Sequence, residues 1–333
     1  MTKRAAIIGD GAMGTLSAML LSHNGWTCGL WSAFEDQAAE IRRAGENRLF
    51  LPGFPLPKGL KISTDAAETA AGADLVVIAV PSRHLRGVLE RTKAALPEAA
   101  VYVSVVKGIE TESLLRPSEI IGHVLGKRRV VALSGPCLSR EVAERLPATV
   151  VVASKDDAAA RAARDAFATP WFRVYTNDDP VGVELGGALK NVIAIAAGIC
   201  DGLELGSNAK AALITRGLVE MTRLGAAMGA KRETFAGLAG LGDLVTTCGS
   251  TLSRNHHVGQ EIGRGRSLED VLTEMGRVEA EGVQTTRSAA ALAQRNGVEM
   301  PITQEIHAVL FEGKPAPDAL ADLMSRAPKK EGA

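Results

Sequence analysis

A glycine-rich hexad near the N-terminus limits what this chain can fold into more than any other feature. The apolar run at 5–9 leads into Gly9, Gly11 and Gly14 with the spacing GxGxxG, and an Ala/Met/Leu-rich stretch continues from 15 to 23. A strand, a tight turn and a helix in this order are typical of a dinucleotide-binding turn, whose second glycine leaves room for the pyrophosphate. A glycine-rich turn without a ligand is the alternative, but the flanking strand and helix favour a dinucleotide site.

Apolar runs without alternation recur through the first half of the chain, as expected for strands buried on both faces of a parallel sheet. After Asn177 such runs stop, and long Ala/Gly/Leu-rich helical stretches continue to the C-terminus. A chain of 333 residues exceeds the size of a single core. We therefore predict an α/β fold with a doubly wound parallel sheet at 1–178 and an all-helical domain at 179–333. The expected strands are 5–9, 27–31, 74–80, 100–106, 130–133, 148–154 and 172–176.

Charge and cysteine content exclude several classes of function. Lys plus Arg and Asp plus Glu both number 38, so no overall field attracts nucleic acid or an acidic membrane. The cysteines have no metal-ligand spacing, so we expect free thiols and no metal site. The apolar run at 192–199 is too short to cross a bilayer, and glycines interrupt the N-terminal run where a signal peptide would be continuous. We expect a cytoplasmic protein that does not insert into a membrane.

One lysine in an apolar helix is the strongest candidate for proton transfer. The stretch 181–199 carries Lys190 as its only cation, with Asn191 beside it. Burial among apolar neighbours can lower an amine pKa by up to about 3 to 5 units. Such a lysine can exchange a proton near neutral pH, as the oxidation of a secondary alcohol requires. The alternative is a lysine whose charged end reaches solvent from the edge of a helix.

Other polar residues lie on turns that can face a ligand. Asp243 lies on the glycine-rich turn 237–248, where it could approach a substrate or cap a helix. The sequence SRN at 253–255 groups donors suited to a phosphate, although an exposed polar turn has the same composition. Lys107 and Gly135 each follow a predicted strand at its carboxyl end, where ligands of open α/β sheets bind. We assign no catalytic role to the histidines, because they lack metal-ligand spacing.

The end of the second predicted strand should indicate which nicotinamide cofactor binds. An acid at this point favours NAD, whereas an arginine accommodates the 2′-phosphate of NADP. Ser32, Ala33 and Phe34 follow Trp31, Glu35 lies slightly beyond them, and the cations Arg42 and Arg43 lie further along the next predicted helix. Because no cation occupies the expected position, we favour NAD.

Taken together, the motifs resemble those of the NAD(P)-dependent sn-glycerol-3-phosphate dehydrogenases. The resemblance extends over essentially the whole chain and implies an N-terminal Rossmann domain, a helical C-terminal domain and a homodimer. It also implies interconversion of dihydroxyacetone phosphate and sn-glycerol 3-phosphate for glycerophospholipid synthesis. The matching segments, in the family's order and spacing, are 9–14, 105–110, 133–136, 185–199, 208–221, 237–248 and 253–255.

The resemblance also implies roles for individual residues. Lys190 would be the proton acceptor, with Asp243 acting beside it. The substrate would be held by Lys107, Gly135, Cys137, Lys190, Asp243, Ser253, Arg254 and Asn255. The cofactor would be lined by Gly9, Gly11, Ala12, Met13, Gly14, Ala33, Lys107, Ser139, Arg254, Ala280 and Glu281. The chain departs from the family's usual residues at Ala12, Met13, Ala33, Cys137 and Ser139.

Two other functions stay open. A β-hydroxyacid dehydrogenase has the same plan and a lysine base, but its substrate carries a carboxylate instead of a phosphate. A non-catalytic nicotinamide-binding regulator is the second alternative. The intact Lys190, Asp243 and 253–255 set argues against a regulator.

Overall fold

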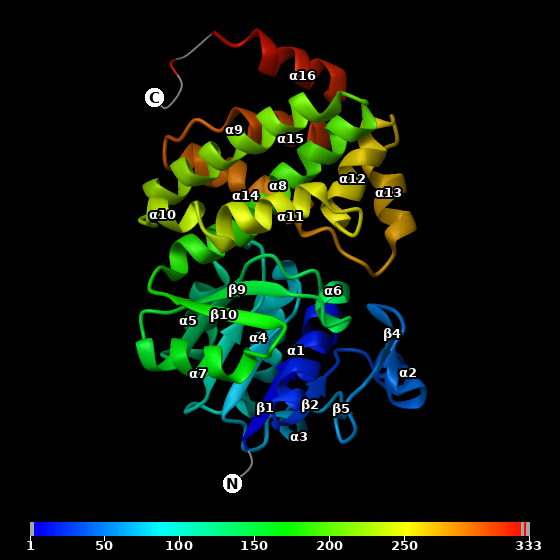
Figure 1. Cartoon of the computed structure of the whole chain (residues 1–333), viewed down its shortest axis with the longest axis vertical. Helices are drawn as coiled ribbons and strands as arrows, with labels where there is room; N and C mark the ends of the chain where they lie inside the picture. The colour runs from blue at the N-terminus through cyan, green and yellow to red at the C-terminus, as the bar shows by residue number, and fades with distance from the viewer. Residues whose placement is uncertain (1–2, 328–329, 331–333) are drawn as a thin grey trace.

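The computed structural model describes residues 3–327 and 330, and the part drawn at the bottom of Figure 1 is built around one sheet. The sheet has eight strands in the order β10-β9-β8-β7-β6-β1-β2-β5. Neighbouring strands are parallel except β8 and β9. The strands are β1 (Arg4–Ile8), β2 (Thr27–Trp31), β5 (Lys61–Ser63), β6 (Leu75–Ile78), β7 (Val101–Ser104), β8 (Arg129–Ser134), β9 (Ala148–Ala153) and β10 (Phe172–Asn177).

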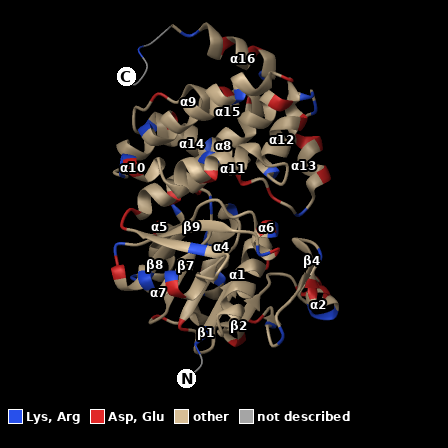
Figure 2. Ribbon diagram, in the orientation of Figure 1, with Lys and Arg blue, Asp and Glu red and all other residues tan. Residues whose placement is uncertain are grey.

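Both faces of this sheet are buried, which explains why its strands are apolar at consecutive positions. In β1, Ala5 and Ile7 belong to the core on one face, and Ala6 and Ile8 belong to the core on the other. Helices α1 (Ala12–His23), α6 (Ser139–Ala143) and α7 (Asp157–Phe167) pack on the first face. Helices α3 (Ala66–Ala70), α4 (Leu85–Thr92) and α5 (Pro117–Leu125) pack on the second. Helix α2 (Glu35–Ala44) follows β2 and carries charges of both signs (Figure 2).

The structure confirms the predicted fold class and departs from the expected strands in two places. The segment 135–147, between β8 and β9, contains only the five-residue helix α6. A parallel β9 would need a crossover back to the other end of β8, and without one β9 runs antiparallel to β8. The short strands β3 (Glu46–Asn47) and β4 (Leu51–Pro55) form an antiparallel pair, and they and β5 had no counterpart in the sequence analysis. None of these three strands contains the long apolar run from which the other strands were predicted.

From Pro180 onward every element is helical, and this part lies above the sheet in Figure 1. Helix α8 (Pro180–Gly202) runs through its centre, with the other helices packed around it. A short π-helical turn, η3 (Leu238–Gly242), precedes α11. The surrounding helices are α9 (Gly206–Ala227), α10 (Arg232–Phe235), α11 (Asp243–Gly249), α12 (Arg254–Gly263), α13 (Leu268–Met275), α14 (Glu281–Arg295), α15 (Pro301–Phe311) and α16 (Ala316–Ser325).

Helix α8 is apolar on all sides because it is the core of the helical part. Every residue from Gly182 to Cys200 is buried. By length and composition the helix could cross a membrane, but 94% of its most apolar window is buried inside the protein. Its hydrophobicity is therefore accounted for by packing against the neighbouring helices.

Glycines let α8 and α12 pack with their backbones in contact. A Cβ atom on Gly198 of α8 would lie 2.0 Å from the carbonyl oxygen of His256, and one on Gly259 of α12 would lie 1.9 Å from that of Ile195. Neither position can accept a side chain unless the helices move apart. This close packing holds the start of α12, at Arg254, beside the middle of α8.

Candidate active site

The predicted phosphate-binding turn joins β1 to α1. Gly9 has a φ of 112°, and a Cβ there would lie 2.6 Å from the carbonyl oxygen of Ala79. A Cβ on Gly14 would lie 1.9 Å from the carbonyl oxygen of Gly9, so α1 packs directly on the turn. A Cβ on Gly11 would meet nothing within 4 Å, and no side chain of the described residues caps α1. The first N–H groups of α1 therefore face open space, as anion binding at a helix N-terminus requires.

A pocket of about 870 Å³ opens in front of this turn. Two residues expected at the cofactor do not line it: Gly14 packs inside the turn, and Ala280 belongs to the helical core. The flanking carboxylates Glu279 and Glu281 line the pocket instead of Ala280. The expected residues that do line it are Gly9, Gly11, Ala12, Met13, Ala33, Lys107, Ser139, Arg254 and Glu281.

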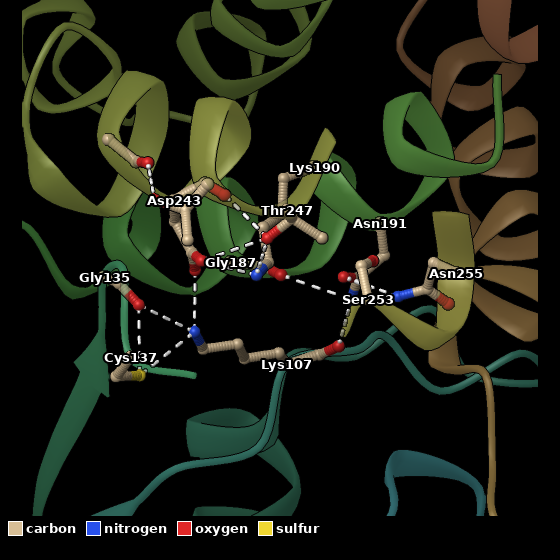
Figure 3. A network of polar contacts seen from close by, with 12 residues as sticks. Lys107, Gly135, Cys137, Gly187, Lys190, Asn191, Asp243, Thr247, Ser253 and Asn255 are labelled. Atoms are coloured by element: carbon tan, nitrogen blue, oxygen red, sulfur yellow. Dashed lines mark hydrogen bonds and ion pairs between the residues drawn. The ribbon is translucent and has the colours of Figure 1, made fainter. Parts of the chain in front are cut away.

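Lys190 does not itself line the pocket, but it lies in the network that Figure 3 draws, one carboxylate away from the lining residue Lys107. Its Nζ donates to Oδ1 of Asp243 at 2.5 Å and to Oγ1 of Thr247 at 2.6 Å. The Lys190 side chain is 7% exposed and that of Asp243 is 2% exposed. The lysine is thus buried and paired, which excludes the alternative of a side chain that reaches bulk solvent.

Lys107 links this buried pair to the pocket. Its Nζ donates to Oδ2 of Asp243 at 2.7 Å and to the carbonyl oxygen of Gly135 at 2.9 Å, and it lies 3.5 Å from Sγ of Cys137. One carboxylate therefore joins two ammonium groups (Figure 3). The structure brings together five of the residues that the resemblance implied for the substrate: Lys107, Gly135, Cys137, Lys190 and Asp243.

The shared carboxylate affects the two lysines differently. Burial lowers the pKa of Lys190 to about 8, because the attraction of Asp243 only partly offsets the loss of hydration and the repulsion of Lys107. Burial also lowers the pKa of Lys107, but Asp243 and Cys137 raise it by more, to above its ordinary value. Burial raises the pKa of Asp243, yet the two ammonium groups lower it below its usual range. Lys190 is therefore the member of the trio that can exchange a proton near neutral pH.

The residues 253–255 do not all face the pocket. The Ser253 hydroxyl caps α12 by accepting from the backbone N–H of His256 at 3.2 Å. The Asn255 amide donates to Oδ1 of Asn191 at 2.9 Å, and its oxygen accepts from the N–H of Gly282 at 2.9 Å. Asn191 in turn donates to the backbone carbonyl of Lys107 at 3.0 Å. Asn255 thus supports the backbone that carries Lys107.

Arg254 is the member of this group that lines the pocket. Within the described part of the chain its guanidinium has no hydrogen bond or ion pair to another side chain. Burial lowers its pKa below the ordinary value for arginine, although Glu281 and Glu279 oppose the shift. An unpaired cation in a pocket is suited to a bound anion, to which arginine can donate two parallel hydrogen bonds.

Several residues at the site were not predicted from the sequence. Thr247 lies one helical turn after Asp243, so the i to i+4 spacing could have indicated it. The sequence singled out Asn191 only as the neighbour of Lys190. In the structure its side-chain amide donates to the backbone carbonyl of Lys107. The hydroxyl and N–H of Ser82 both donate to the carboxylate of Glu281, 199 residues away. Nothing local in the sequence indicates the contact with Ser82.

Comparisons with known proteins cover almost the whole chain. Residues 4–160 match the model of the N-terminal part of NAD-dependent glycerol-3-phosphate dehydrogenase, and residues 179–321 match that of its C-terminal part. The NAD(P)+ glycerol-3-phosphate dehydrogenase of Geobacter sp. (strain M21) is 51% identical over 335 residues, with 100% of both chains covered. The enzyme of that name from Streptomyces avermitilis is 48% identical over 330 residues, covering 98% of each. A crystal structure of glycerol-3-phosphate dehydrogenase from Coxiella burnetii matches with a TM-score of 0.94 at 39% identity, covering 98% of this chain and 99% of that one.

Proposed function

The chain belongs to the NAD-dependent glycerol-3-phosphate dehydrogenase family, and on this premise we propose how its side chains carry out the reaction. The enzyme interconverts dihydroxyacetone phosphate and sn-glycerol 3-phosphate with NAD or NADP. The turn at Gly9 and Gly11 and the pocket of about 870 Å³ fit a dinucleotide, because a side chain at Gly11 would project into the pyrophosphate's space. When bound, the nicotinamide exchanges a hydride with the substrate carbon.

Lys190 supplies or removes the proton that must accompany this hydride. During reduction its ammonium donates a proton to the oxygen that was the ketone, and during oxidation its neutral amine takes the proton from the alcohol. A pKa of about 8 makes both forms accessible near neutral pH. Asp243 and Thr247 hold the amine in place. The shared contact of Lys190 and Lys107 with Asp243, beside the pocket, is the observation that carries this proposal.

We propose that the substrate phosphate binds near Arg254, the pocket cation that has no partner among the described side chains. Lys107 also lines the pocket, but Asp243 balances its charge, so Arg254 is the cation left for the substrate anion. Its guanidinium suits a phosphate, to which it can donate two parallel hydrogen bonds. A substrate panel tests this part, because a β-hydroxyacid dehydrogenase would turn over carboxylate substrates instead.

The role of Lys190 is tested by Lys190→Met, which keeps the length of the side chain and removes the amine. We expect turnover of dihydroxyacetone phosphate with NADH to fall by about 10² to 10⁴-fold. Lys231→Met is the matched control, because Lys231 is 52% exposed and pairs with Asp178 at the surface. Circular dichroism should show both variants folded. Normal turnover in a folded Lys190→Met variant would contradict the proposal.

Four further points stay proposals. From the change of pattern after Asn177 we propose that the chain divides near residue 178, which agrees with the gap between Asn177, the end of β10, and Pro180, the start of α8. We also propose that the protein acts in the cytoplasm and, from the family resemblance, that it is a homodimer and feeds glycerophospholipid synthesis. Light scattering of the purified protein tests the dimer, since a monomer mass would contradict it.

A further inference from the structure

We propose that Arg91 and Arg277 bind the 2′-phosphate of NADP(H), so that this chain uses NADPH although Ala33 provides no cation. The inference rests on the proposed function, because it assigns the adenosine end of the same dinucleotide pocket. It replaces the expectation that NAD is favoured, which was drawn from the lack of a cation directly after the second strand.

The adenosine end of the pocket lies where β2 ends. In this fold the residues after the second strand meet the adenosine ribose. Trp31, Ala33 and Phe34 line the pocket there. The carboxylates next in sequence, Glu35 and Asp36, do not line it. Asp10 lines the pocket beside the end of β2, but its Oδ2 already accepts from the hydroxyl of Ser32 at 2.7 Å. In the described lining no acid directly follows β2 in sequence to accept from the two ribose hydroxyls, as a site selective for NAD requires.

Two guanidinium groups from distant segments line the pocket at this end. Cζ of Arg91, on α4, lies 5.7 Å from the centre of the Trp31 ring. Cζ of Arg277, in the segment between α13 and α14, lies 5.4 Å from the centre of the Phe34 ring. These two rings flank Ala33 in the sequence, so the arginines lie around the position where the sequence provides none. A guanidinium over an aromatic ring keeps its edge N–H groups free for phosphate oxygens.

The charges already present at this end leave both arginines able to bind an anion. Among the described residues Arg91 is exposed and has no ion pair. Arg277 pairs with Asp36 at 3.1 Å, but the two side chains are 56% and 65% exposed. Exposed pairs contribute about 0 to 1 kcal/mol, so a phosphate can compete for the guanidinium. The Glu35 carboxylate accepts hydrogen bonds from Arg42 and from Thr64, so it is already bound to residues other than these two arginines.

The inference is tested by comparing both reduced cofactors in Arg91→Gln, Arg277→Gln and the double variant. Each substitution should lower kcat/KM for NADPH by about ten- to hundredfold, the range for one charge-assisted hydrogen-bonding group, and change that for NADH by less than about threefold. Arg43→Gln is the matched control, because Arg43 is a 78% exposed cation on α2 that does not line the pocket. In the wild type we expect kcat/KM for NADPH to equal or exceed that for NADH. Unchanged cofactor ratios in the double variant would overturn the proposal.

A binding experiment separates this inference from the proposed reaction. Calorimetry should show adenosine 2′,5′-bisphosphate binding to the wild type at least tenfold more tightly than adenosine 5′-monophosphate. The difference should disappear in the double variant. Equal affinity of the wild type for the two nucleotides would overturn the inference, even if the enzyme reduces dihydroxyacetone phosphate with NADH. Absence of that reduction would contradict the proposed function, while the nucleotide titration would still decide the inference.

Discussion

At the residue scale, the two lysines differ because their surroundings differ, although both contact Asp243. Lys190 lies on an apolar helix with its side chain 7% exposed, whereas Lys107 lines the pocket with 17% exposed. Once Lys107 and Asp243 form a neutral pair, a second buried ammonium is disfavoured. Desolvation thus selects Lys190 as the group that releases a proton. The sequence predicted that Lys190 is desolvated, and the structure shows that Lys107 competes with it for Asp243.

Asp243→Asn tests this electrostatic balance. Loss of the carboxylate removes the attraction that raises the pKa of Lys190, so its ammonium should lose its proton at a pH well below about 8. The pH at which reductive kcat/KM declines should move to lower pH, with activity reduced at least about hundredfold. The pH profile of kcat/KM measures the shift. A profile with the wild-type midpoint would contradict the assignment of the titrating group to Lys190.

The same variant should lose stability, since it removes the carboxylate that pairs with both buried lysines. Removing one partner of a buried pair costs about 3 to 5 kcal/mol. Asp178→Asn is the control: it breaks an exposed pair with Lys231 and should cost about 1 kcal/mol or less. Urea unfolding at pH 7 measures both free energies.

At the element scale, a buried carboxylate caps a helix in the helical part. Glu220 of α9 is 3% exposed, and its oxygens accept from the N–H groups of Ile302 at 2.7 Å and Thr303 at 3.2 Å. These two groups belong to the first turn of α15, which Pro301 begins. Burial raises the pKa of Glu220 to about 7, although the three hydrogen bonds to its carboxylate oppose the shift. The cap thus joins α9 to α15 and titrates near neutral pH.

Glu220→Gln tests this titration. The unfolded chain releases the Glu220 proton near pH 4.5 and the folded chain near pH 7, so between these values folding retains the proton and stability falls as the pH rises. The Glu220→Gln variant has no titrating group at this position. Its free energy of unfolding, measured relative to the wild type in urea, should therefore increase from pH 5 to pH 8 by up to about 3 kcal/mol. Glu98→Gln, at an 87% exposed side chain, is the control. Parallel curves for Glu220→Gln and the wild type would contradict the raised pKa.

At the scale of the whole molecule, buried polar contacts join the helical part to the sheet. Glu184 of α8 accepts from the backbone N–H and the hydroxyl of Ser118 at 2.7 Å each, and it pairs with Arg116 at the start of α5. Beside it, Val183 packs against Ala132 of β8 and Val151 of β9. Both parts line the pocket, so this contact helps to set its shape.

Glu184→Ala should therefore affect stability and binding together. It removes the buried partner of Arg116, which is 11% exposed and keeps only the more exposed Glu119, so the unfolding free energy should fall by up to about 3 to 5 kcal/mol. We expect KM for both cofactor and substrate to rise, because the two parts then meet less rigidly. Glu144→Ala is the control, because its pair with Arg140 is exposed, at 41% and 57%. Unchanged KM values in a clearly destabilised variant would show that this contact does not shape the pocket.

The sequence by itself determined the features that depend on local pattern. The runs around Ile7, Val77 and Val103 predicted strands because burial on both faces requires consecutive apolar residues. The glycine spacing indicated the phosphate turn, and the apolar stretch around Lys190 indicated a buried amine. The short strands β3, β4 and β5 were not predicted, because they contain no run of consecutive apolar residues of this length.

Only the tertiary structure decided which distant side chains meet. Asp243 contacts Lys190 across 53 residues and Lys107 across 136, and Arg277 reaches Asp36 across 241. Periodicity describes which face of an element is buried, but these contacts depend on how the helical part packs on the sheet. The absence of a cation at Ala33 therefore did not decide the charge around the adenosine end of the pocket, because packing brings Arg91 and Arg277 there from other segments.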